Sequence, residues 1–180
     1  MKKILIALCA LSFSAVSFCR PAPPPDPMAQ ADGFFAKQLY QQALEKYQEE
    51  ALAAKGEKKY RAVYRATECE ALLFRYAQAA QRVFAEPLPG NFLWKSRFLM
   101  LRTEVAREML KQYGYGLPQD SQEGTDDLTK RTPRQWRDAI EADYLELWKL
   151  REKLIYVPLE GEDYYVDLKD AVLDYTPTLW

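Results

Sequence analysis

Apolar and polar positions follow a helical period along most of the chain. The apolar residues fall mostly three or four positions apart, which places them on one face of an α-helix. This spacing covers residues 29–54, 57–85, 91–113 and 133–154. Gly56 and the Pro87–Gly90 stretch interrupt the pattern, as residues that break helices do. The pattern predicts an all-α fold of antiparallel helical hairpins, arranged either as a helical repeat or as a four-helix array.

The last of these stretches has the clearest start signal. Thr132 is suited to the N-cap, Pro133 to the first helical position, and Gln135 to the partner position of a capping box. Gly114 is expected to close the preceding helix as its C′ residue, and a loop is expected over 114–131. Beyond the last helix, we expect a short irregular or β-hairpin tail.

One short stretch points to a repeat. Tyr40, Ala43, Leu44 and Tyr47 have the spacing found in the second helix of a tetratricopeptide repeat, which this segment resembles. The resemblance implies a helix over 27–37, a turn at 38–39, a second helix over 40–54, and a surface for protein or peptide partners. Ala36 then stands where such repeats place a small residue for close helix contact.

A weaker copy of the same spacing follows 36 residues later. It consists of Tyr76, Ala79, Ala80 and Val83. Tetratricopeptide units have a period of about 34 residues, and Leu72 replaces the small residue of the first unit. A plain antiparallel bundle is the alternative, because any such bundle needs small and aromatic residues at these spacings.

A second resemblance concerns the whole arrangement. The segments GNFLWKSRFLMLRTEV at 90–105, RTPRQW at 131–136 and DYTPTLW at 174–180 resemble the N-terminal helical region of bacterial alpha-2-macroglobulin-like proteins. In that family a large body that traps proteases would follow. The family's thioester motif, Cys-x-x-Gln, is missing here because Leu72 stands three positions after Cys69, so trapping is not carried over.

The N-terminal part indicates export. A basic start, an apolar run and small residues before position 18 are typical of a signal peptide over 1–17. A Pro-rich tether over 18–28, a helical domain over 29–155 and an extension over 156–180 follow. We expect a periplasmic or secreted protein. Acylation of Cys19, as in bacterial lipoproteins, would instead anchor the chain to the envelope.

Composition narrows the function. The chain lacks His, which excludes His-based catalysis and His-ligated metals, and its net charge of −1 does not indicate nucleic-acid binding. Aromatic residues make up 13% of the chain, enough to predict an exposed Tyr or Trp patch that anchors a partner. The candidate anchors are Tyr40, Tyr47, Tyr60, Tyr64 and Trp94, and the alternative for each is burial in the core. We expect a protein–protein interaction module without enzymatic activity, cofactor or metal.

The acidic C-terminal region supports a different hypothesis. A carboxylate-dependent enzyme or a Ca²⁺-binding protein would use the acids of residues 160–174, which are Glu160, Glu162, Asp163, Asp167, Asp170 and Asp174. Their spacing does not match a Ca²⁺ loop, and a solvated acidic edge is the simpler interpretation. Cys69 lies in a helical pattern and is expected to be buried and reduced.

Overall fold

The computed structural model describes residues 26–119, 127–159 and 162. The predicted signal peptide, Cys19, most of the tether and most of the C-terminal extension lie outside these residues. Within them the chain is all-α, as predicted, and no strand is present. The α-helices are α1 (Pro27–Ala36), α2 (Tyr40–Ala53), α3 (Gly56–Leu72), α4 (Tyr76–Ala85), α5 (Phe92–Tyr113) and α6 (Pro133–Leu154). Short 3₁₀ turns span Gly114–Gly116 and Leu128–Lys130.

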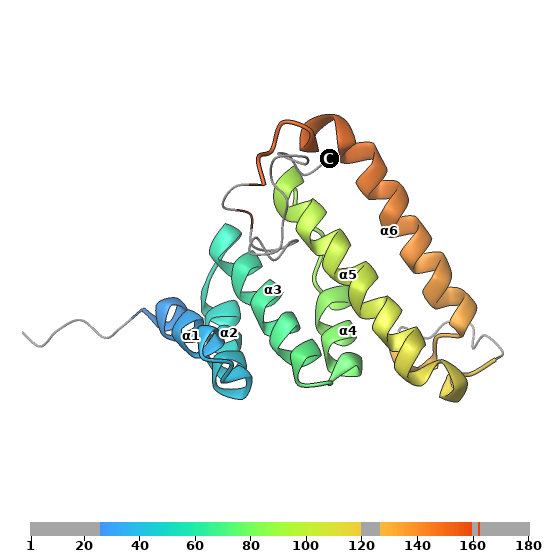
Figure 1. Ribbon diagram of the computed structural model, residues 1–180, viewed down its shortest axis with the longest axis horizontal. Helices are drawn as coiled ribbons and strands as arrows, with labels where there is room; N and C mark the ends of the chain where they lie inside the picture. The colour runs from blue at the N-terminus through green and yellow to red at the C-terminus, as the bar shows by residue number, and fades with distance from the viewer. Residues whose placement is uncertain (1–25, 120–126, 160–161, 163–180) are drawn as a thin grey trace, which may run out of the picture.

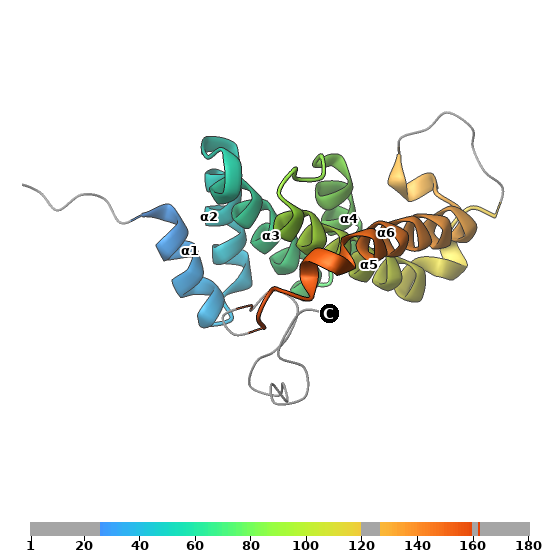
Figure 2. The same ribbon diagram turned by 90° about the horizontal axis from the view of Figure 1, so that it is seen from above.

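The helices follow one another through space in chain order, from α1 at one end to α6 at the other (Figures 1 and 2). Each helix packs against the next one in the chain, and α3 also contacts α5. Buried side chains form two adjoining clusters. One joins α1, α2 and α3 around Tyr47, and the other joins α3 to α6 around Phe98 and Trp136. This is the nearest-neighbour packing of stacked helical hairpins.

The stretch over residues 57–85 is two helices, so the prediction of one continuous helix there was wrong. α3 ends at Leu72 and α4 begins at Tyr76, with Phe74 between them in the left-handed backbone region at φ 60°. The Phe74 N–H donates to the Ala71 carbonyl at 2.9 Å, and the Arg75 N–H donates to the Glu70 carbonyl at 2.8 Å. These bonds satisfy carbonyls at the end of α3 while the chain reverses.

The turn between α1 and α2 has the same geometry 36 positions earlier. Gln38 has φ 59°, and its N–H donates to the Phe35 carbonyl at 2.9 Å. The Leu39 N–H donates to the Phe34 carbonyl at 3.0 Å. The donors and acceptors of these two hydrogen bonds match those of the α3–α4 turn position for position. The turn predicted at 38–39 is therefore present, and the fainter copy in the sequence marks a second turn of the same form.

The helices that follow the two turns also bury equivalent positions. In α2 these are Ala43, Leu44 and Tyr47, and in α4 they are Ala79, Ala80 and Val83. Ala36 does not make the close helix contact expected of it, because it is the last residue of α1 and its side chain is exposed.

The start of α6 agrees with its sequence signal. The Gln135 N–H donates to the Thr132 hydroxyl at 3.2 Å, and the Thr132 N–H donates to the Gln135 side chain at 2.8 Å, which completes the capping box with Pro133 in the first turn. The expectation for Gly114 was wrong. Its φ of −54° is right-handed, because the chain tightens there into a 3₁₀ turn instead of reversing through a left-handed residue.

Candidate functional site

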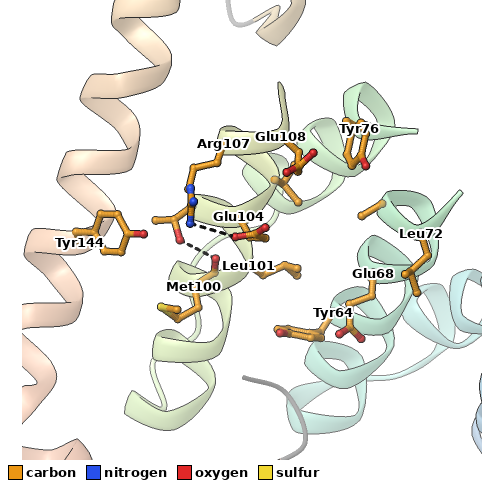
Figure 3. A pocket seen from close by; sticks show the side chains of 13 residues that line it. Tyr64, Glu68, Leu72, Tyr76, Met100, Leu101, Glu104, Arg107, Glu108 and Tyr144 are labelled. Atoms are coloured by element: carbon orange, nitrogen blue, oxygen red, sulfur yellow. Dashed lines mark hydrogen bonds and ion pairs between the residues drawn. The ribbon is translucent and has the colours of Figure 1, made fainter. Parts of the chain in front are cut away.

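A groove runs between α3 and α5, and we call it the α3–α5 groove. It encloses about 360 Å³. In Figure 3, α5 runs through the middle, α3 and the start of α4 lie on one side, and Tyr144 of α6 lies on the other. Its apolar and aromatic lining consists of Tyr64, Ala71, Leu72, Tyr76, Met100, Leu101, Val105 and Tyr144, and its polar lining of Glu68, Thr103, Glu104, Arg107 and Glu108.

Helical spacing on α5 gives the groove its mixed character. Leu101 and Val105, four residues apart, are buried and form part of the apolar core. Met100 and Glu104 have the same spacing one position earlier, and both are exposed. The α5 face therefore changes from apolar to charged across its width, so that an apolar floor lies beside a polar edge.

The lining has three carboxylates and one guanidinium, and each carboxylate pairs with a cation of the same helix. Glu104 lies 3.6 Å from Arg107 with both side chains more than half exposed, so water screens this pair strongly. Glu108 accepts from Lys111 at 3.1 Å, and this hydrogen bond keeps the pKa of Glu108 below its usual range. Glu68 pairs with Arg65 at 2.8 Å. The polar edge is therefore a row of ion pairs within single helices, beside an apolar surface.

The five predicted anchors lie mostly in the core. Tyr47 is fully buried, its hydroxyl donates to Asp32 at 2.7 Å, and burial raises the pKa of the phenol. Tyr64 and Trp94 are also buried, whereas Tyr40 and Tyr60 are half-buried. Tyr64 is the one member of this set that lines the α3–α5 groove. Contact of these five residues with a partner stays a prediction.

Ring contacts explain why these aromatic side chains are held inside. The Tyr40 ring centroid lies 5.6 Å from that of Phe35, and the Tyr60 centroid lies 6.2 Å from those of Trp94 and Phe98. Such tilted and edge-to-face pairs stabilise helix–helix contacts. These rings therefore account for much of the packing between neighbouring helices.

The expected exposed aromatic patch is present, but on α6. Tyr144 is 44% exposed and Trp148 is 55% exposed, and their spacing of four places them on one helix face beside the exposed Leu145. Sequence reasoning missed Tyr144 as a surface residue because it continues the apolar stripe that Trp136 and Ile140 begin. In the structure the preceding residue, Asp143, is buried, and Tyr144 is exposed.

Of the six acids in the C-terminal region, Glu162 lies among the described residues. Glu162 is buried and pairs with Arg97 at 2.6 Å, and the Arg97 guanidinium lies 4.4 Å from the Trp94 ring centroid. The other five acids of that cluster lie outside the described residues. Within the described ranges, no group of three or more Cys, Asp or Glu side chains is arranged to hold a metal ion. Cys69 is buried and unbridged, as expected, and burial raises the pKa of its thiol to about 12.

The described helices also bear on the membrane question. None of them combines the length and apolar character needed to cross a bilayer.

Comparisons with protein-family models, curated proteins and solved structures give no match. The resemblances to tetratricopeptide repeats and to alpha-2-macroglobulin-like proteins therefore stay predictions, and the chain is assigned by its fold class alone.

Proposed function

We propose that this chain is a helical protein–protein interaction module that captures an extended peptide segment of another protein in the α3–α5 groove. The observation that carries the proposal is the groove itself, with buried Leu101 and Val105 beneath it and exposed Met100 and Tyr144 at its edges. Its volume of about 360 Å³ lies within the range of ligand-binding clefts. If residues 1–17 act as a signal peptide, the partner is met outside the cytoplasm.

The proposal agrees with the way helical arrays bind peptides. Stacked hairpins form extended surfaces in which exposed side chains of successive helices face a common groove. Here α3, α4, α5 and α6 all contribute lining residues. An extended peptide gains affinity from a few anchor side chains that fill apolar depressions, while polar groups at the edge set its orientation.

Selection from a random peptide library displayed on phage tests the function directly. The purified full chain is the target, and enriched peptides are then labelled and titrated by fluorescence anisotropy. We expect the double variant Met100→Ala/Tyr144→Ala to raise Kd by about tenfold, because two exposed anchors are truncated. Leu52→Ala is the control, since Leu52 is 90% exposed on α2 and does not line the groove.

Two results would exclude the proposed function. One is a selection that enriches no peptide. The other is a set of peptides that bind the double variant as tightly as the unchanged chain.

A further inference from the structure

The turn between α3 and α4 holds a residue that local structure does not favour. Phe74 has φ 60°, a conformation in which glycine or asparagine is usual and a bulky side chain is strained. Its side chain is nevertheless 75% exposed, so burial of the ring does not offset the strain. Strained residues of this kind often serve function.

The first hairpin shows that the turn does not need an aromatic side chain. Gln38 occupies the matching position with φ 59° and the same pair of backbone hydrogen bonds, and its polar side chain is exposed. The backbone geometry is therefore independent of the ring at position 74. The turn itself therefore does not require an exposed Phe in this place.

The surroundings of Phe74 connect it to the α3–α5 groove. Its ring meets that of Tyr76 edge-on, with centroids 6.2 Å apart. Tyr76 and the exposed Leu72, on either side of the turn, both line the groove. Phe74 thus extends the apolar edge of the groove at the α3–α4 turn. On α5, Glu104 and Glu108 provide the carboxylates, and they pair with Arg107 and Lys111 of the same helix, with which a bound cation would share them (Figure 3).

We propose that this end of the groove binds a basic peptide segment of another protein, in which a large apolar side chain is flanked by Lys or Arg. The apolar side chain packs against Phe74, Leu72 and Tyr76, and the cation lies at Glu104 and Glu108. The inference rests on the proposed function and specifies the class of partner. Charge also disfavours the chain's own C-terminal residues as occupant, because residues 163–180 contain four Asp and a single Lys.

Glycine substitutions at the two matching turn positions separate binding from folding. Phe74→Gly relieves the backbone strain and removes the ring, whereas Gln38→Gly relieves the same strain at a residue that does not line the groove. We expect both variants to melt about 2 °C higher than the unchanged chain. The binding probe is a short labelled peptide in which Lys and Leu alternate. Its Kd is expected to rise at least about tenfold with Phe74→Gly and to stay within about twofold with Gln38→Gly.

A second pair of measurements tests charge. The matched peptide in which Glu replaces every Lys is expected to bind at least about tenfold more weakly. The double variant Glu104→Gln/Glu108→Gln is expected to weaken binding of the Lys peptide several-fold and to reduce its sensitivity to salt. Phe74→Leu keeps the strain and a large apolar side chain, and is expected to retain most of the affinity.

Several outcomes would overturn this inference. Two of them concern the turn variants: Phe74→Gly binds the Lys peptide as tightly as the unchanged chain, or Gln38→Gly loses as much affinity as Phe74→Gly. Three concern the occupant: the Glu peptide binds more tightly than the Lys peptide, a peptide copied from residues 163–180 does so, or a second copy of the chain occupies the groove. If Phe74→Gly lowers the melting temperature, Phe74→Leu decides, and loss of binding in that variant also overturns the proposal. Library peptides that respond to Met100→Ala/Tyr144→Ala but not to Phe74→Gly would leave the proposed function intact and refute only this deeper assignment.

Discussion

Asp143 shows how one buried carboxylate is held between two helices. It lies on α6, is almost fully buried, and its Oδ2 is 3.0 Å from Nε of Arg102 on α5. The two atoms are close enough for an ion pair but do not form an aligned hydrogen bond. Burial raises the pKa of Asp143, and the attraction of Arg102 offsets this only in part. Net destabilisation of the charged form is common for buried ion pairs.

The raised pKa predicts how Asp143→Asn responds to pH. Below the unfolded-state pKa of about 3.9, Asp143 is neutral in both states and the substitution changes little electrostatically. As pH rises, the carboxyl ionises more easily in the unfolded chain than in the folded one, so the unchanged protein loses stability that the Asn variant keeps. The Asn variant is therefore expected to gain stability relative to the unchanged chain between about pH 3 and pH 7. The difference in the free energy of unfolding, variant minus unchanged chain, is more positive at pH 7.

Urea denaturation at the two pH values measures this difference. Asp138→Asn is the control for loss of a carboxylate, because Asp138 lies on the same helix and its side chain is 65% exposed. If Asp143→Asn is instead less stable relative to the unchanged chain at pH 7 than at pH 3, the prediction is contradicted. The attraction between Asp143 and Arg102 would then outweigh the cost of burial.

At the scale of single elements, helix ends follow local chemistry. The capping box of α6 satisfies two backbone N–H groups that would otherwise lack partners, and it includes the N–H of Thr132 itself. The Asn91 side chain at the start of α5 accepts from Leu93 and Trp94 in the same manner. Such caps involve residues two or three apart, which is why they can be found without knowledge of the fold.

Removal of the α6 cap has an expected cost. Thr132→Ala takes away the acceptor for the Gln135 N–H, and we expect it to lower the free energy of unfolding by about 1 kcal/mol. Urea denaturation measures the change, with Arg134→Ala as the control on the exposed side of the same turn. A loss no larger than that of the control would mean that the cap contributes little.

The break between α3 and α4 could not be predicted from residues close together in the sequence. Apolar spacing continues through residues 57–85, and no Gly or Pro marks the turn at Phe74. The reversal rests on a left-handed residue and on packing of α4 against α3 and α5. The fainter copy of the Tyr40–Tyr47 spacing at Tyr76 was the one signal that could have located it.

At the scale of the molecule, the two core clusters predict uneven stability. The cluster of α1 to α3 is smaller and lies at one end of the array, whereas the cluster of α3 to α6 is larger. In arrays whose units contact mainly their neighbours, terminal units open at lower free energy than the interior. α1 and α2 are therefore expected to exchange their amide hydrogens through local opening.

A matched pair of Met→Ala variants tests this uneven stability by native-state hydrogen exchange. Met28 and Met109 are both 3% exposed and belong to the smaller and the larger cluster respectively. Met28→Ala is expected to lower protection at least about tenfold in α1 and α2 while leaving α5 and α6 unchanged, because the cavity loosens only its own cluster. Met109→Ala is expected to lower protection in α4 to α6. Uniform loss throughout the chain in both variants would instead indicate one cooperative unit.

The sequence by itself determined the all-α class, the bounds of most helices and the cap at Thr132. It also indicated the turn near Gln38 and the weaker copy of the Tyr40–Tyr47 spacing 36 residues later. These features depend on residues within one or two helical turns of each other, so periodicity and capping chemistry reveal them. Only the tertiary structure decided that Tyr47 and Trp94 are buried while Tyr144 and Phe74 are exposed. It also brought α3, α4, α5 and α6 together as a groove. An apolar stripe shows that a helix has a face to bury, but the packing of neighbouring helices determines which part of that face stays open.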